Sequence, residues 1–132
     1  MKVIVAGTRH FSDYNLLHEK LDHLLQNVTE DIHIISGKAA GADRFGEIYA
    51  KAKGYNIIEC PAKWTDFTVK PCAIRYRRDG TPYNALAGHN RNEEMAKIAD
   101  ACVCFWDGRS TGTKNMIELA QKYKLKLRVI RY

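Results

Sequence analysis

Residues 33–43 read His33-Ile34-Ile35-Ser36-Gly37-Lys38-Ala39-Ala40-Gly41-Ala42-Asp43, a short apolar run followed by a loop of small residues. The apolar run predicts a buried strand, and the apolar spacing from Phe45 to Ala52 predicts a helix that ends at Gly54. Parallel strands are joined by crossover helices, because their ends lie at opposite edges of the sheet. This strand, glycine-rich turn and helix therefore indicate a parallel sheet.

The same succession recurs along the whole chain. The predicted strands are residues 2–6, 33–36, 56–60, 101–106 and 127–130. The predicted helices are the leucine-spaced segment after Ser12 and Asp13, the segment 45–52, the segment 90–99, and a last one through Met116, Ile117, Ala120 and Tyr123. Alternating strands and helices with right-handed crossovers predict a Rossmann-like, doubly wound α/β fold of about five strands.

The domain organisation is predicted to be simple. A chain of 132 residues with 45% hydrophobic residues is long enough for one core, so we expect a single domain over 1–132. Residues from about 62 to 88 lack periodicity, and their Asp79-Gly80 pair is typical of a hairpin turn. We interpret this segment as a flap insertion that contains a β-hairpin and covers a ligand.

Composition restricts the possible functions. No apolar run is long enough for a signal peptide or a membrane span, so we expect a cytoplasmic protein that does not bind membranes. The cysteines Cys60, Cys72, Cys102 and Cys104 lack CxxC spacing, which favours free thiols over a metal site, and we expect no metal and no cofactor. The net charge of +6 favours an anionic partner.

Two loops are candidates for binding that anion, residues 36–43 and residues 107–113. Each follows a strand and begins a helix, where unpaired N–H groups and the helix dipole favour a phosphate. Lys38 would add a full charge. Alternatively, the glycines only make tight turns and Asp43 caps its helix. Residues 108–114 read GRSTGTK, which is not a Walker motif, and GxGxxG is absent.

In a doubly wound sheet, ligands bind beyond the carboxyl ends of the strands. Arg9 and Arg91 are expected to reach this crevice, Trp106 to stack on a base or pack in the core, and the flap aromatics to cover the ligand or anchor the flap. The candidate ligand-binding residues are Gly7, Thr8, Arg9, Ser36, Gly37, Lys38, Gly41, Ala42, Asp43, Arg91, Trp106, Asp107, Gly108, Ser110, Thr111, Gly112 and Thr113. The flap aromatics are Trp64, Tyr76 and Tyr83.

Four ordered motifs carry a resemblance that covers nearly the whole chain. They are Val3–Arg9, Ile35–Gly37 with Gly41–Arg44, Arg91–Ala96, and Phe105–Gly108 with Gly112–Ile117. The sequence resembles the YspA-related branch of the SLOG superfamily, whose relatives include the DNA-processing protein DprA and the "lonely guy" (LOG) phosphoribohydrolases. The resemblance implies a Rossmann-like fold that binds nucleoside monophosphates, ADP-ribose relatives or signalling nucleotides, commonly as a homodimer or higher homo-oligomer.

The hydrolase relatives use an Arg and a Glu, and this chain departs from that pattern. Arg91 is similar to the family's Arg, but the position of the Glu is occupied by Met116, and Glu118 lies two residues further round the helix. Arg91 and Glu118 remain as catalytic candidates. Asp43 and Asp107 are possible substitutes for the missing carboxylate, but Asp43 is better explained as a helix cap and Asp107 as a turn residue. We therefore expect a protein that binds or senses a nucleotide derivative, one version being sequestration in a conflict between phage and bacterium. The alternatives are a LOG-like phosphoribohydrolase and a DprA-like nucleic-acid-associated protein.

Overall fold

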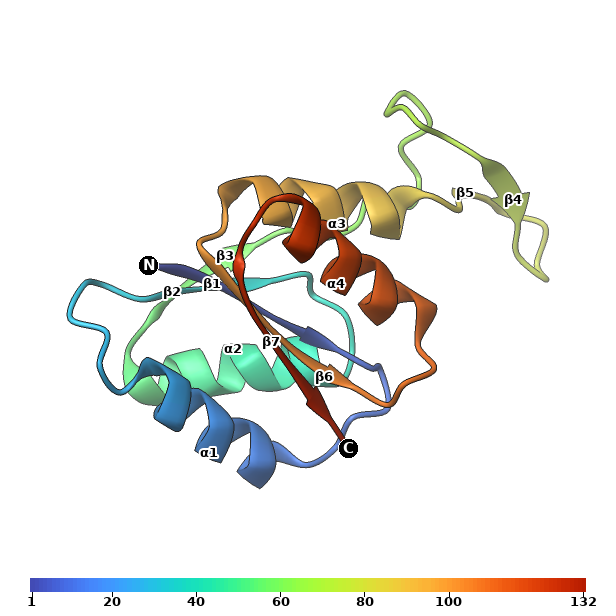
Figure 1. Cartoon of the computed structure of the whole chain (residues 1–132). Coiled ribbons are helices and arrows are strands. Elements are labelled where there is room, and N and C mark those ends of the chain that lie inside the picture. The colour runs from blue at the N-terminus through green and yellow to red at the C-terminus, as the bar shows by residue number, and fades with distance from the viewer.

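The computed structural model describes residues 1–132. A central sheet of five parallel strands has the order β3-β2-β1-β6-β7. Its strands are β1 (Lys2–Gly7), β2 (His33–Ser36), β3 (Asn56–Glu59), β6 (Ala101–Trp106) and β7 (Lys126–Arg131). The helices are α1 (Tyr14–Leu25), α2 (Ala42–Lys53), α3 (Ala87–Ile98) and α4 (Thr111–Lys122). The predicted doubly wound α/β fold is confirmed (Figure 1).

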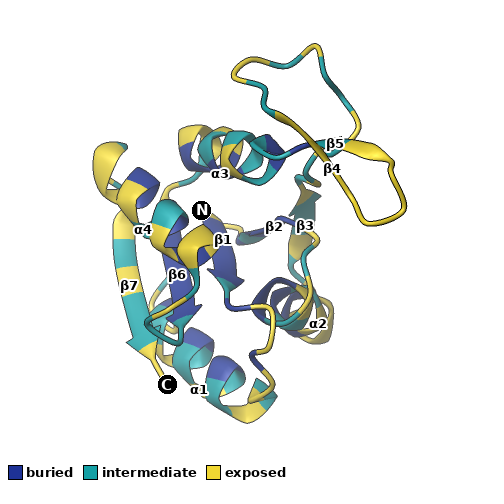
Figure 2. Ribbon diagram, turned by 90° about the vertical axis from the view of Figure 1, so that its right-hand side faces the viewer, coloured by how far each residue is buried: buried dark blue, intermediate teal, exposed yellow.

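Helices cover both faces of the sheet, and alternation along the strands supplies a core to each face. In β1, Val3 and Val5 belong to the apolar cluster under α1 and α2, whereas Ile4 and Ala6 belong to the cluster under α3 and α4. The central strands β1 and β6 are therefore almost fully buried, as Figure 2 shows. Burial on both faces explains why these strands are continuous apolar runs.

Local signals in the sequence fix most element boundaries. The Asp13 carboxylate accepts a hydrogen bond from the Leu16 N–H and caps α1, and Gly54 ends α2 in the left-handed conformation. The start of α3 was predicted wrongly, because this helix begins at Ala87 rather than at Asn90. Gly88 lies in its first turn, where a Cβ atom would come within 3.3 Å of the Trp64 ring. Packing against an aromatic ring, rather than helix propensity, explains a glycine there.

The segment between β3 and α3 contains the predicted hairpin. Strands β4 (Ile74–Tyr76) and β5 (Pro82–Asn84) pair antiparallel and project from the body of the molecule (Figure 1). The buried Asn84 side chain ties the base of this segment together, accepting from the N–H groups of Ala73 and Leu86 and donating to the Asp66 carbonyl.

No helix is long and apolar enough to cross a bilayer.

Candidate functional site

The main cleft lies where the sheet changes winding direction. From β1 the chain crosses to β2 on one side, and from β6 it crosses to β7 on the other, so the loops after β1 and β6 diverge between these adjacent strands. The loops and the first turns of α2, α3 and α4 enclose a cleft of about 580 Å³. This is the size range of small-molecule sites.

The first turn of α4 is open toward this cleft. The Ser110 hydroxyl caps the helix by accepting from the Thr113 N–H at 3.3 Å, while the N–H groups of Thr111 and Gly112 have no hydrogen-bond partner in the chain. A Cβ atom added to Gly112 would meet nothing within 4 Å. Free N–H groups and open space at a helix N-terminus make a receptive position for an anion.

Asp107 and Thr8 fix the loop that leads into α4. One Asp107 carboxylate oxygen accepts from the N–H groups of Ser110 at 2.9 Å and Arg109 at 2.8 Å. These hydrogen bonds, first that from Ser110, hold the pKa of Asp107 below its usual value. The Thr8 hydroxyl accepts from the Asp107 N–H at 3.3 Å and so joins the loops after β1 and β6. Both residues line the cleft.

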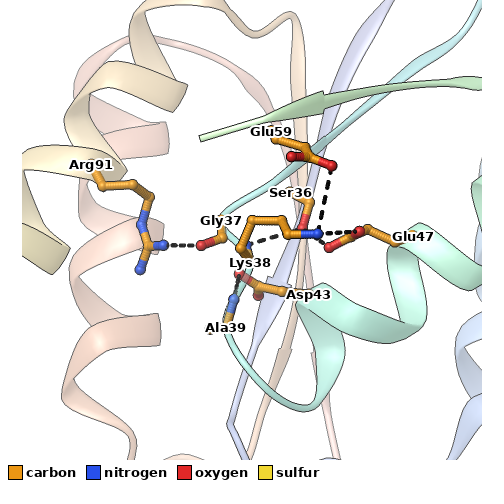
Figure 3. A network of polar contacts seen from close by, with 8 residues as sticks. All are labelled: Ser36, Gly37, Lys38, Ala39, Asp43, Glu47, Glu59 and Arg91. Carbon is orange, nitrogen blue, oxygen red and sulfur yellow. Dashed lines mark hydrogen bonds and ion pairs between the residues drawn. The ribbon is translucent and has the colours of Figure 1, made fainter. Parts of the chain in front are cut away.

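The loop of residues 36–41 is held from behind by carboxylates. The Lys38 ammonium donates to Glu47 at 2.8 Å and pairs with Glu59 at 3.5 Å, and the Ser36 hydroxyl donates to Glu47 at 2.7 Å (Figure 3). Lys38 does not line the main cleft; it borders a smaller neighbouring hollow. The structure therefore shows Lys38 engaged in positioning the loop, where the sequence predicts a contact with phosphate.

Gly41 is required by the fold itself. Its φ of 78° is in the left-handed region, and a Cβ atom there would clash with the carbonyl oxygens of Thr8 and Arg9. The space beside Gly41 is therefore filled by the loop after β1 rather than left open for a ligand. The two glycine loops, alike in sequence, differ in their access to the cleft.

Asp43 does not have the capping role that the sequence suggests. The N-cap position is Gly41, and Asp43 is the second residue of α2, with its carboxylate accepting from the Ala39 N–H at 3.4 Å. Asp43 is among the residues that line the cleft, although it is only 4% exposed. Burial raises the pKa of Asp43 to about 6, and the neighbouring charge of Arg91 limits this rise.

Arg91 comes from the second turn of α3 and bridges two parts of the site. Its guanidinium donates to the Gly37 carbonyl and to Asn92 Oδ1, as Figure 3 shows for Gly37. A Cβ atom on Gly37 would lie 2.7 Å from the Asp43 carboxylate and would clash with Arg91, so only glycine permits this approach. Arg91, Arg9 and Arg109 all line the cleft, which makes its wall cationic.

The structure brings together ten of the seventeen predicted ligand-binding residues. Those that line the main cleft are Gly7, Thr8, Arg9, Asp43, Arg91, Asp107, Ser110, Thr111, Gly112 and Thr113. Those that do not are Ser36, Gly37, Lys38, Gly41, Ala42, Trp106 and Gly108. Trp106 is occupied elsewhere, since its indole N–H donates to the Ser110 carbonyl and Arg131 lies over its ring.

Several residues that line the cleft were not among the predicted ligand-binding residues. They are Ala6, His10, Ala39, Ala85, Gly88, His89, Asn92, Met95 and Arg109. Four of these nine residues, Gly88, His89, Asn92 and Met95, come from α3, whose start was predicted three residues too late. Asn92 donates to the Gly112 carbonyl and to Asn115, so it fixes the start of α4 from the neighbouring helix.

The carboxylate expected of a hydrolase relative is not supplied by Glu118. Met116 lines the cleft with its side chain almost wholly buried, whereas Glu118 is exposed and lies outside it.

The flap residue Trp64 also lines the cleft. Its ring packs edge-on against the Tyr83 ring, with the two ring centroids 6.4 Å apart. The site thus combines arginines, free helix N–H groups, one aromatic ring and one buried carboxylate.

Comparisons with known proteins agree with this architecture. The Gene 61 protein of Mycobacterium phage D29 is 27% identical over 125 residues, which cover 92% of this chain and 89% of that protein. DNA processing protein A from Helicobacter pylori, which has a single-stranded DNA binding mode, superposes with a TM-score of 0.66 at 23% identity over 98% of this chain. DprA from Streptococcus pneumoniae superposes with a TM-score of 0.69 at 19% identity over 99% of this chain.

The chain spans only 64% and 50% of the lengths of these two DprA chains, and at such identities the likeness concerns the fold. A family model gives a more specific match, to residues 1–67, which are just over half of the 132 residues. That segment contains β1, the loop after β2 and all of α2. The chain belongs to the YspA, cpYpsA-related SLOG family.

Proposed function

We propose that the chain binds or senses a phosphate-bearing nucleotide derivative in the main cleft. The observation that carries this proposal is the open first turn of α4, where the N–H groups of Thr111 and Gly112 have no partner in the chain. A phosphate there would accept both hydrogen bonds and meet the positive end of the helix dipole. Arg9, Arg91 and Arg109 add charge to the same cleft.

The ligand class is a nucleoside monophosphate, an ADP-ribose relative or a signalling nucleotide. A cleft of about 580 Å³ is large enough for a nucleotide, and Trp64 offers an aromatic surface for a base. Binding without hydrolysis is favoured by Met116, because a thioether neither activates water nor stabilises an oxocarbenium ion as a carboxylate does. Sequestration or sensing needs only that the ligand binds, and no bond of the ligand has to be broken.

Thermal denaturation with a ligand panel tests this proposal. Nucleoside mono-, di- and cyclic phosphates, NAD and ADP-ribose are added at millimolar concentration, and a ligand present at 100 times its Kd stabilises the folded state by about 2.7 kcal/mol. The Gly112→Val variant should lose the rise in Tm, because its side chain occupies the open space. Glu118→Gln, on the same helix but outside the cleft, should keep it. No shift with any ligand would contradict the proposal.

Single-stranded nucleic acid is a second candidate, favoured by the hairpin. Arg75 and Tyr83 are paired across its strands, and the Arg77 guanidinium lies 5.0 Å from the Tyr83 ring centroid. Basic and aromatic side chains on one face suit phosphates and unstacked bases. DNA processing protein A, a structural neighbour, has a single-stranded DNA binding mode.

Fluorescence anisotropy with a labelled oligothymidylate distinguishes the two candidates. If the hairpin binds nucleic acid, Arg75→Ala and Arg77→Ala should weaken binding and each lower its salt dependence by about 0.7 in log-log slope. Gly112→Val should leave this binding unchanged, because Gly112 lies in the cleft. Binding that survives both hairpin substitutions would contradict the hairpin as the nucleic-acid site.

A further inference from the structure

Asp43 is the buried carboxylate of the main cleft, whereas the other lining carboxylate, Asp107, accepts hydrogen bonds from the N–H groups of Arg109 and Ser110. The cleft wall carries three arginines and free helix N–H groups, all suited to anions, yet the buried Asp43 carboxylate lines it as well. An ionised carboxylate only accepts hydrogen bonds, and it repels a phosphate. The part of the ligand that faces Asp43 must therefore be a hydrogen-bond donor rather than the phosphate.

No close ion pair neutralises this carboxylate, although the charge of Arg91 nearby favours its ionised form. The Arg91 guanidinium donates to Gly37 and Asn92 instead of forming an ion pair with Asp43, and the hydrogen bond that Asp43 accepts from the Ala39 N–H is long at 3.4 Å. Burial of an acceptor without strong partners costs free energy, so its presence at a cleft is a sign of a functional role.

The strand order places the different groups of the cleft in sequence. Trp64 follows β3, Asp43 follows β2, the loop of Gly7 to His10 follows β1, and the start of α4 follows β6. Adjacent strands are about 4.8 Å apart, so β2 and β6 lie about 10 Å apart. A nucleoside 5′-phosphate with its phosphate on α4 and its base at Trp64 has its sugar in between, beside Asp43.

We propose that Asp43 accepts hydrogen bonds from the ribose hydroxyls of the ligand and makes the cleft selective for ribonucleotides over deoxyribonucleotides. This inference rests on the proposed nucleotide binding and names the sugar that the cleft prefers. A carboxylate is well suited to the task, because its two oxygens can accept from adjacent hydroxyls, as in the dinucleotide-binding folds.

Isothermal titration calorimetry with matched sugars tests the assignment. The probes are the 5′-monophosphates of adenosine, guanosine, cytidine and uridine, each with its 2′-deoxy and 3′-deoxy counterparts. The wild-type protein should bind the preferred ribonucleotide about tenfold or more tightly than its deoxy forms, the range expected for hydrogen bonds to a charged group. In Asp43→Asn, this ratio should fall to near one.

A control separates recognition from support of the loop. Glu47→Gln weakens the contacts with Ser36 and Lys38 behind the loop, so it should lower the affinity for ribo and deoxy forms by the same factor. Equal affinities in the wild type, or an equal loss for all sugars in Asp43→Asn, would overturn the role of Asp43. Inosine monophosphate tests the other donor, since loss of binding on replacing the adenine amino group, with no effect of the sugar, would assign Asp43 to the base.

The two proposals fail in different ways. If no nucleotide of either sugar series binds the wild-type protein, nucleotide binding itself is wrong. If ribo and deoxy forms bind equally well, nucleotide binding stands and only the assignment of Asp43 falls.

Discussion

Two glycines with similar sequence surroundings have opposite physical roles. Gly41 adopts a left-handed φ with the carbonyl oxygens of Thr8 and Arg9 against its backbone, whereas Gly112 begins a helix beside open space. A side chain at the first position collides with the protein, and one at the second collides only with a ligand. Gly41 therefore supports folding, and Gly112 is the position at which binding can be altered separately.

Substitution by alanine should separate these roles. Gly41→Ala should lower the free energy of unfolding by about 2 kcal/mol or more, because it combines left-handed strain with a clash against backbone. Gly112→Ala should change it by less than about 1 kcal/mol, in the stabilising direction if at all. Urea denaturation followed by circular dichroism measures both, and similar losses in the two variants would contradict the distinction.

Asp43 should make stability depend on pH. Its folded-state pKa of about 6 is above the usual value near 3.8, so between these values the native state binds more protons than the unfolded state. The free energy of unfolding therefore falls as pH rises from about 4 to about 6, by on the order of 2 kcal/mol.

Asp43→Asn should remove this contribution and be at least as stable as the wild type at pH 7.5. Thermal denaturation at several pH values measures both effects. A variant that keeps the slope between pH 4 and 6 would assign it to another group.

At the scale of elements, the helices and strands can be predicted from local sequence patterns. Which loop residues face the cleft cannot, because it depends on contacts between segments far apart in sequence. Strands 33–36 and 101–106 were predicted with their observed ends, because apolar runs and flanking glycines define them. The start of α3 was missed, because Gly88 disfavours a helix locally and only its contact with Trp64 explains it. Likewise, the clash at Gly41 comes from a loop more than 30 residues away in sequence.

The flap should respond to ligand in one part only. Trp64 lines the cleft, and Asn84 connects that part of the flap to the start of α3, whereas the turn at Asp79-Gly80 projects away from the body. Hydrogen exchange at amides near Trp64 and Leu86 should therefore slow when a nucleotide binds. The hairpin turn should exchange at the same rate with and without ligand, and slowing confined to that turn would contradict the role of the flap as a cover.

At the scale of the whole molecule, the cleft lies where the sheet changes winding direction, and the charged β7 edge limits how copies of the chain can associate. The edge strand β7 carries Lys126, Arg128 and Arg131 along its length. Charged edges resist pairing with another sheet. We propose that the chain forms the homo-oligomer that its resemblance implies, and that its copies associate through surfaces other than the β7 edge of the sheet.

Native mass spectrometry of freshly purified protein tests assembly and ligand together. A homodimer should appear at twice the chain mass of 15.1 kDa. Because the chain carries a net charge of +6 and a cationic cleft, a tightly held nucleotide should co-purify and add its own mass to each copy. Collisional release of that ligand identifies its base and its number of phosphates, and Gly112→Val should appear without the added mass. An added mass that persists in Gly112→Val would place the ligand outside the main cleft. A monomer at micromolar concentration would contradict the proposed homo-oligomer, but the cleft of each copy would still be complete.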